Sequence, residues 1–228
     1  VTVHHLLVPH FRPDTEAIAD VLVTMFEGAM LPPGWGRHAN SATQVVLPTE
    51  WSMRLFAAAG VPADRLRAMT PPIDTTLFDP NRFPPRHASR FRRRRWLIAY
   101  DQHARRGHEL LLQALGTTFR GEEAEIAILP DPHGTETVQQ LEQASLGTLA
   151  RYQTGRAIQL SAYAPAASVE DAIARYAAAD VFVLPCRGEG WDRSLQEAML
   201  MELPIITSAS SSLGGLQLDE STAYPVHS

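Results

Sequence analysis

Two glutamates, Glu189 and Glu197, stand eight residues apart in the run DVFVLPCRGEGWDRSLQEAMLMELPIIT, which covers residues 180–207. A carboxylate accepts hydrogen bonds from hydroxyl groups, and each charge-assisted bond of this kind is worth roughly 1.5–3 kcal/mol. Two such acids facing one cleft could therefore hold the hydroxyl groups of a sugar or a ribose. Two glycines, Gly188 and Gly190, flank the first glutamate and favour a loop around it.

The residues around the two acids predict the elements that position them. We expect a strand over residues 180–185, the glycine-bearing loop, a helix over about residues 193–201 and a second strand over residues 203–207. Continuous apolar stretches of this kind are typical of parallel strands that are covered on both faces. The loop would then leave the carboxyl end of a strand, where open α/β sheets bind ligands. The helix would aim its amide end at the same place, which suits a phosphate.

This stretch resembles the E-x7-E signature of retaining, nucleotide-sugar-dependent glycosyltransferases of the GT-B architecture (family 4, or group 1). The strongest matches are Glu-Gly-Trp at 189–191, Gln-Glu-Ala-Met at 196–199 and Leu-Pro-Ile-Ile at 203–206. Residues 45–80 resemble the end of the family's first domain and the start of the interdomain connection. Residues 25–35 resemble an FE…LP…W pattern found in some of these enzymes. The resemblance runs from about Phe26 to Val226.

The resemblance implies roles for particular side chains. Glu189 would be a catalytic residue that holds the sugar hydroxyls, and Glu197 would accept hydrogen bonds from the ribose hydroxyls. Gly190 would belong to the donor-binding loop. Backbone amides near Ser194 and Leu195 would help to stabilise the leaving diphosphate.

Arginine replaces lysine throughout this chain, since all twenty basic residues are arginine. The family places a lysine before a glycine to hold the donor diphosphate, and Arg106, followed by Gly107, takes that position here. Arg106 is therefore the second predicted catalytic residue, with Arg105 as a donor-binding neighbour. Many relatives carry a further arginine at the end of the preceding strand, where this chain has Tyr100 and Asp101.

The expected partners follow from the same charges. Arginine and a helix N-terminus would carry the positive charge, and the sequence has no Asp-x-Asp motif. We therefore expect no metal and no cofactor, with a nucleotide-sugar donor as substrate and an acceptor (glycan, lipid or protein) that the sequence does not reveal. The arginine-rich run at residues 90–96 is interpreted as a solvated linker rather than a nucleic-acid site, because the net charge is −5.

After residue 95, strands and helices alternate. We expect strands over residues 96–100, 124–129 and 157–162, and helices over about residues 107–118, 135–152 and 169–179. Such alternation implies parallel pairing through right-handed crossovers. The predicted fold class is α/β: a Rossmann-like parallel sheet with helices on both faces. By resemblance, residues 96–228 are the C-terminal, nucleotide-sugar donor-binding domain of a GT-B enzyme.

The front of the chain is expected to be the closing part of a second Rossmann-like domain. It would comprise residues 1–75, a remnant of the N-terminal acceptor domain, followed by a proline- and arginine-rich linker over residues 76–95. Expected elements are strands at residues 4–10, 44–48 and 65–69, and helices at residues 14–28 and 49–59. Thr49 would cap the second helix and Gly60 would end it. The resemblance implies a longer enzyme, so we expect this chain to be truncated at both ends.

The 228-residue composition is that of a globular protein. No apolar run reaches the roughly 18 residues needed to span a membrane, and the start does not resemble a signal peptide. The single cysteine, Cys186, fits a reducing compartment. We therefore expect a cytoplasmic protein.

Two departures from the family pattern leave an alternative open. Asp192 and Glu202 stand where the family commonly has glycine. A residue with a side chain in the left-handed turn expected at Glu202 costs on the order of 1 kcal/mol. Asp192 adds negative charge near the expected diphosphate. The alternative is a non-catalytic or degenerate nucleotide- or sugar-binding homologue. A Rossmann oxidoreductase is a poorer interpretation, because no G-x-G-x-x-G follows the first strand.

Overall fold

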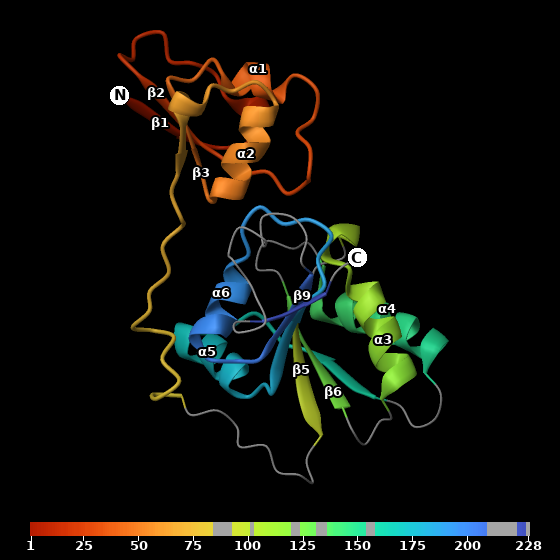
Figure 1. Ribbon diagram of the computed structural model, residues 1–228. Coiled ribbons are helices and arrows are strands. Elements are labelled where there is room, and N and C mark those ends of the chain that lie inside the picture. Colours follow the sequence, from red (N-terminus) through yellow and green to blue (C-terminus); the bar gives the residue numbers. More distant parts are fainter. Residues whose placement is uncertain are drawn as a thin grey trace. The chain divides into compact units, whose positions relative to one another are not determined.

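The computed structural model describes residues 1–83, 93–100, 103–119, 124–130, 136–153, 158–208 and 223–226. Two compact units make up the chain. Among the described residues, the first unit holds Val1–Pro72 and Gly188–Asp192, and the second holds Ile73–Arg187, Arg193–Ser208 and residues 223–226. Each unit is built on one parallel sheet (Figure 1). Residues 84–92 of the predicted linker and Asp101 lie outside the described residues.

The second unit contains a six-stranded sheet in which every paired strand is parallel, in the order β10-β9-β8-β5-β6-β7. The strands are β5 (Arg94–Tyr100), β6 (Ala124–Pro130), β7 (Gln159–Ala162), β8 (Val181–Leu184), β9 (Ile205–Ser208) and β10 (Tyr224–Val226). The apolar run at residues 181–184 predicted a strand that is covered on both faces. All four residues of β8 are buried, as this prediction requires.

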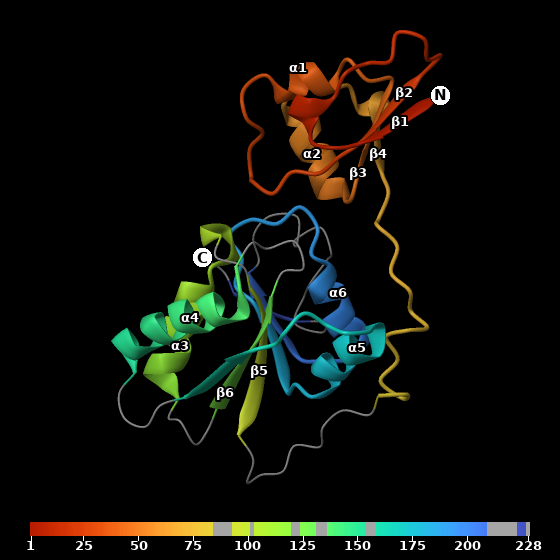
Figure 2. The ribbon, with the colours of Figure 1, turned by 180° about the vertical axis from the view of Figure 1, so that it is seen from behind.

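Helices cover both faces of this sheet. They are α3 (His108–Thr118), α4 (Val138–Tyr152), α5 (Val169–Ala177) and α6 (Arg193–Leu200). In both ribbon views, α3 and α4 lie on one face and α5 and α6 on the other (Figures 1 and 2). The predicted α/β Rossmann-like arrangement is therefore confirmed. Local sequence supports the helices, because a capping box between Thr137 and Gln140 begins α4 and the side chain of Ser168 caps α5.

The strand order contains a reversal beside β5. The chain runs from β5 to β6 and β7 in one direction, then returns to form β8 on the other side of β5. The segments that leave the carboxyl ends of β5 and β8 therefore start from neighbouring strands. Crevices at such reversals are where open α/β sheets bind ligands.

The first unit has a four-stranded parallel sheet in the order β1-β2-β3-β4. Its elements are β1 (Thr2–His5), β2 (Asp20–Val23), α1 (Trp35–Ala39), β3 (Gln44–Leu47), α2 (Glu50–Ala58) and β4 (Leu66–Ala68), with 3-10 turns at Val8–His10 and Ala63–Arg65. Phe56 of α2 packs in one core cluster with Leu22 of β2 and Val45 of β3. The predicted cap is present, since the hydroxyl oxygen of Thr49 accepts a hydrogen bond from the Ser52 amide at 3.1 Å. Gly60 ends the helix at φ +92°, also as predicted.

The helix predicted over residues 14–28 is wrong. This segment instead contributes β2, the strand that pairs with both β1 and β3. The Asp20 carboxylate contacts His4 Nε2 at 2.7 Å, and its backbone amide donates to the Thr43 hydroxyl at 3.0 Å. These contacts with distant residues, together with the strand preference of Val21 and Val23, outweigh the helix propensity of the preceding alanines.

The strand predicted over residues 4–10 is also longer than the one observed. β1 ends at His5, and Pro9 lies in the first turn of the 3-10 helix Val8–His10. Proline favours the first turn of a helix because it has no amide to donate and its φ is fixed near the helical value. The short helix α1, which follows Gly34 at φ +87°, was not predicted.

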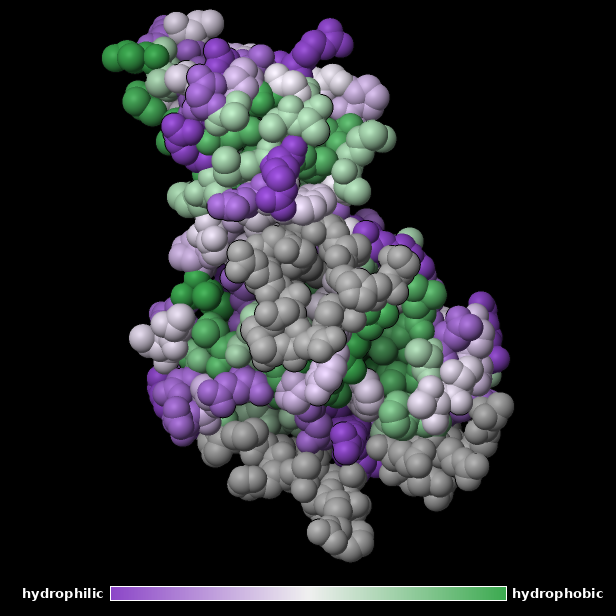
Figure 3. Space-filling model, in the orientation of Figure 1, coloured by the Kyte–Doolittle hydropathy of each residue, from purple (hydrophilic) through white to green (hydrophobic). Residues whose placement is uncertain are grey.

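The visible surface mixes residue types. Hydrophobic and hydrophilic residues are interspersed on the face drawn in Figure 3. Large apolar side chains with high exposure include Leu110 of α3 and Leu146 of α4. Within the described ranges, none of the helices combines the length and apolar character needed to cross a membrane.

Candidate functional site

Two loops meet at the strand reversal of the second unit. After β5 comes a 3-10 turn, Ala104–Arg106, which carries both predicted phosphate-binding arginines. After β8 come residues 185–187. The backbone amide of Arg187 donates to the Arg105 carbonyl at 2.6 Å, so the two loops are joined through their main chains. The arginine-bearing loop at the strand reversal is therefore fastened to the neighbouring loop after β8.

Gly107 makes this close approach possible. Its φ is +63°, a left-handed conformation that glycine adopts without steric cost. A Cβ atom built on Gly107 would lie 2.0 Å from the carbonyl oxygen of Pro185. Any side chain at this position would therefore push the two loops apart, which gives the family's glycine after the cation a physical reason.

The side chain of Arg187 adds a second fastening. Its guanidinium donates to the carbonyl of Ala104 and to the carboxylate of Glu109, in the first turn of α3. Burial would raise the pKa of Glu109, but the hydrogen bond and charge of Arg187 outweigh it, and the pKa lies below its ordinary value. Both side chains are more than two fifths exposed, so solvent screens this ion pair.

The two predicted arginines differ in burial. Arg106 is 9% exposed, and its backbone amide donates to the His103 carbonyl at 3.0 Å. Arg105 is half-buried. Tyr100, which ends β5 where relatives carry an arginine, is buried with its ring centroid 3.8 Å from that of His108. In this chain an aromatic pair thus occupies the end of β5.

Glu197 lies on α6 with both carboxylate oxygens engaged. The hydroxyl of Tyr176, on α5, donates to Oε2 at 2.7 Å. Arg193, one turn earlier on α6, donates from Nε to Oε1 at 3.0 Å. The carboxylate is mostly buried, with 15% of its side chain exposed, whereas the Arg193 side chain is 74% exposed. Glu197 therefore has one partner on a neighbouring helix, Tyr176, and one exposed partner on its own helix, Arg193.

Aromatic packing holds Tyr176 in turn. It is 3% exposed, and its ring lies 6.1 Å from Phe78 in an edge-on contact and 6.3 Å from Phe182 of β8. Offset and edge-on pairs at these separations are favourable. The hydroxyl that reaches Glu197 consequently comes from a ring with little freedom to move.

The remaining predicted site residues fall in or beside α6. Ser194 and Leu195 lie in its first turn, where amide groups and the positive end of the helix dipole are found. Glu189 and Gly190 belong to Gly188–Asp192, the segment grouped with the first unit, and Glu189 is buried.

Glycines let this segment pack closely within the first unit. A Cβ atom on Gly188 would lie 2.4 Å from the carbonyl oxygen of Glu27, and one on Gly190 would lie 3.2 Å from the sulfur of Met25. The first distance is too short for any side chain, so glycine is required at position 188.

The turn after α6 is strained as predicted. Glu202 has φ +55°, and among the described residues no other residue besides glycine has a positive φ. The expectation that a side chain here replaces a left-handed glycine is confirmed. Asp192, the other departure from the family pattern, is buried. The two arginines nearest to Asp192 in sequence, Arg193 and Arg187, form ion pairs with Glu197 and Glu109.

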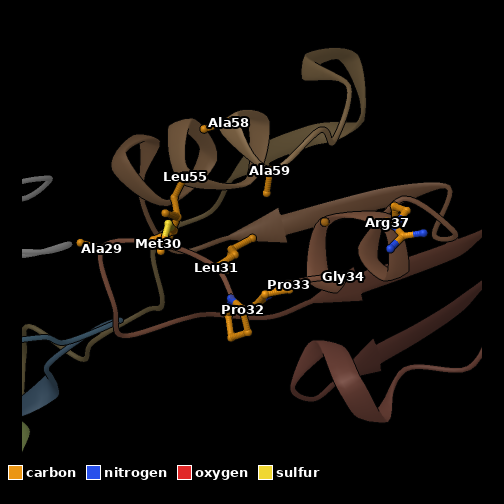
Figure 4. A pocket seen from close by; sticks show the side chains of 11 residues that line it. Ala29, Met30, Leu31, Pro32, Pro33, Gly34, Arg37, Leu55, Ala58 and Ala59 are labelled. Atoms are coloured by element: carbon orange, nitrogen blue, oxygen red, sulfur yellow. The ribbon is translucent and has the colours of Figure 1, made fainter.

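A separate pocket of about 410 Å³ lies in the first unit (Figure 4). It is lined by residues 29–34 and by Gly36, Arg37, Leu55, Ala58 and Ala59. Met30, Leu55 and Arg37 all line it, and the guanidinium of Arg37 is drawn apart from the other two side chains. Arg37 supplies the sole polar side chain of this lining. The lining of the pocket therefore has no carboxylate or other side-chain oxygen that could accept hydrogen bonds from sugar hydroxyls.

Two contributors to the site had no usable signal in the sequence. Arg187 lies three residues after the end of β8, but its partner Glu109 is 78 positions earlier in the chain. Tyr176 lies 21 positions before its carboxylate partner. A tyrosine on the apolar side of an amphipathic helix is ordinarily a packing residue, so only the three-dimensional contact distinguishes it.

Across the described residues, no group of three or more His, Cys, Asp or Glu side chains is arranged to hold a metal ion.

Comparison with solved structures shows the fold. HepE from Anabaena, in complex with UDP and glucose, aligns with a TM-score of 0.68 at 14% identity, over 91% of this chain and 58% of that one. Sucrose-phosphate synthase from Thermosynechococcus elongatus gives 0.64 at 17% identity, over 93% and 56%. WaaG, a glycosyltransferase involved in lipopolysaccharide biosynthesis, gives 0.60 at 12% identity, over 93% and 65%. This chain thus spans less than two thirds of each of these GT-B proteins.

No curated protein matches the chain in sequence. A family match does exist, and it covers residues 97–224, from within β5 to the start of β10. This range contains the loops at the strand reversal, Glu197 and the turn at Glu202. The chain belongs to the glycosyl transferases group 1 family.

Proposed function

We propose that this chain is the donor-binding part of a glycosyltransferase that takes a hexose from a nucleotide sugar. The sugar would pass to a glycan, lipid or protein acceptor with retention of configuration. HepE, the neighbour described above, binds UDP and glucose in its crystal structure, which makes a UDP-sugar the first donor to test. This chain aligns with only 58% of HepE, so the similarity alone does not assign a donor. The donor is therefore proposed from the site residues of this chain.

The joined loops at the strand reversal carry the proposal. Arg105 and Arg106 lie in the loop after β5, at a strand reversal of the kind where open α/β sheets bind nucleotides. Gly107 and Arg187 fasten this cationic loop to the end of β8. A preorganised cation stabilises a leaving diphosphate more than a mobile one, because it does not have to be reoriented as charge develops.

The diphosphate would bind between the arginine loop and the N-terminus of α6. Arg106 and Arg105 would neutralise its charge, and backbone amides at Ser194 and Leu195 would add to that stabilisation. With these groups in place of a metal ion, we propose that transfer needs no divalent cation. Chelation with EDTA should then leave donor affinity unchanged.

Glu197 would recognise the ribose. Each carboxylate oxygen can accept about two hydrogen bonds. Tyr176 and Arg193 use one position on each oxygen, so further acceptor positions remain for ribose hydroxyls. Since the Arg193 side chain is 74% exposed, it can also move aside when a nucleotide enters.

Glu189 would hold the hydroxyls of the transferred sugar, with Gly190 beside it. The carboxylate is buried in the structure, and burial strengthens its hydrogen bonds to a bound sugar by excluding water. Glycine at position 188, where a side chain would clash with Glu27, keeps the backbone of this loop in place.

Turnover of the donor tests the proposal. The chain should bind UDP-glucose or GDP-mannose and slowly release UDP or GDP by hydrolysis when no acceptor is present. Glu189→Gln should abolish release, because it removes the charge that holds the sugar. Glu16→Gln, which removes an exposed carboxylate from the first unit, is the matched control and should behave as the original chain. Absence of nucleotide binding would refute the proposal.

A second candidate is a binding module that no longer transfers. It is favoured by the strained turn at Glu202, which lies directly after the helix that carries Glu197. In that case the chain would bind a nucleotide sugar with the same dependence on Glu197 but would show no release above the rate of the Glu189→Gln variant.

A further inference from the structure

Tyr176 and Arg193 hold Glu197 in unequal ways. Tyr176 is 3% exposed, lies on a different helix and makes ring contacts with both Phe78 and Phe182. Arg193 lies one turn from Glu197 on the same helix, and its side chain is 74% exposed. Exposed ion pairs of this spacing are weak and are screened by salt. One carboxylate oxygen therefore has a fixed partner and the other a replaceable one.

As a consequence, the two oxygens of the Glu197 carboxylate have different surroundings. The Tyr176 hydroxyl donates to Oε2 at 2.7 Å, a short, charge-assisted bond in a mostly buried setting. It fixes the rotation of the carboxylate and turns Oε1, the oxygen shared with Arg193, toward the exposed side. A ligand hydroxyl that displaces Arg193 would meet an acceptor already oriented for it.

We propose that Tyr176 is a positioning residue that fixes Glu197 so that the chain distinguishes ribose from deoxyribose in its nucleotide ligand. The inference rests on the proposed function, because it assigns a partner to the acid that would accept from the ribose. Without the hydroxyl, Glu197 keeps its charge and can turn toward Arg193. The variant then loses binding free energy from the hydrogen bond to the ribose hydroxyl, while the contribution of the diphosphate to binding is unchanged.

A ratio of affinities measures this role. Calorimetric titrations would compare UDP with 2′-deoxy-UDP, and GDP with 2′-deoxy-GDP, on the original chain and its variants. The chain should bind the ribonucleotide about tenfold more tightly, the value of one charge-assisted hydrogen bond. Tyr176→Phe should lower this ratio to about twofold while affinity for the deoxynucleotide stays the same. Glu197→Gln should lower the ratio in the same way.

Two controls separate positioning from packing. Tyr163→Phe removes a hydroxyl from the ring that Arg175 covers at 4.8 Å and should leave the ratio unchanged. Leu141→Ala removes a buried side chain from α4, on the opposite face of the sheet from Tyr176. It should lower thermal stability at least as much as Tyr176→Phe, again with the ratio unchanged.

The outcomes distinguish this inference from the proposed function. If Glu197→Gln lowers the ratio of ribonucleotide to deoxynucleotide affinity and Tyr176→Phe leaves it unchanged, the positioning role of Tyr176 is refuted and the donor site stands. Equal weakening of both nucleotides by Tyr176→Phe would also refute it, since that indicates a packing role alone. If the original chain binds neither nucleotide, the proposed function fails and this inference fails with it.

Discussion

Single residues at the site owe their roles to neighbours that are distant in sequence. The family resemblance was enough to predict Arg106, Glu189 and Glu197 as site residues, and these assignments remain predictions. It also placed a left-handed residue at Glu202, which the structure confirms with φ +55°. Tyr176 was not predictable as a partner of Glu197, because its hydrogen bond depends on how α5 and α6 pack side by side.

Glycine at position 107 should be essential to the joined loops. Gly107→Ala places a Cβ atom 2.0 Å from the Pro185 carbonyl and forces a left-handed φ on alanine. We expect a loss of at least about 2 kcal/mol in the free energy of unfolding in urea, or a displaced loop with the donor affinity lost. Gly147→Ala is the control, because nothing lies within 4 Å of that position on α4. It should stabilise the chain by about 0.5–1 kcal/mol.

Glutamate at position 202 should lower stability. Glu202→Gly relieves the left-handed strain at an exposed turn and should raise the free energy of unfolding by about 0.5–1 kcal/mol. Glu202→Ala removes the same carboxylate but keeps the Cβ atom, so it should gain little. Equal stabilisation by both variants would show that charge, and not backbone conformation, is the cause.

At the scale of the elements, long apolar runs were predicted better than short mixed ones. The strand–helix alternation after residue 95 is confirmed, with element ends shifted by a few residues. The segment over residues 14–28 failed because its alanines and its valines favour different structures. Pairing of β2 with strands on both sides decided the outcome, and no local pattern contains that information.

The contact between the β8 loop and α3 should respond to pH. Burial raises the pKa of Glu109, but the hydrogen bond and charge of Arg187 lower it further, to below its ordinary value. A lowered pKa in the folded state contributes stability above the ordinary glutamate pKa of about 4.3, and this is lost as pH falls through the folded-state value. Because both side chains are over two fifths exposed, the contribution is at most about 0.5 kcal/mol.

Unfolding at two pH values measures that contribution. Glu109→Gln should be less stable than the original chain at pH 7, and the difference should vanish below about pH 3. Arg187→Gln should reduce stability at pH 7 by a similar amount, and 1 M salt should diminish both effects. A difference that is the same at pH 7 and pH 3 would contradict the assigned ion pair.

For the molecule as a whole, the fold class could be predicted but the strand order could not. Alternating strands and helices indicate a parallel sheet, yet several orders satisfy that pattern. The return of the chain past β5 to form β8 is a tertiary feature. That return places the arginine loop next to the segment after β8, and the proposed donor site depends on it.

The central claim is that a nucleotide sugar binds at this strand reversal, held by Arg106 and Glu197. The most direct measurement is a calorimetric titration of UDP-glucose and GDP-mannose into the original chain, Arg106→Ala and Glu197→Ala. Arg37→Ala, which removes an exposed arginine from the first unit, serves as the control for Arg106→Ala, and circular dichroism checks that each variant is folded. We predict that each of the two site variants weakens donor binding about tenfold or more, while the control does not. Unchanged affinity in both site variants would contradict the assignment.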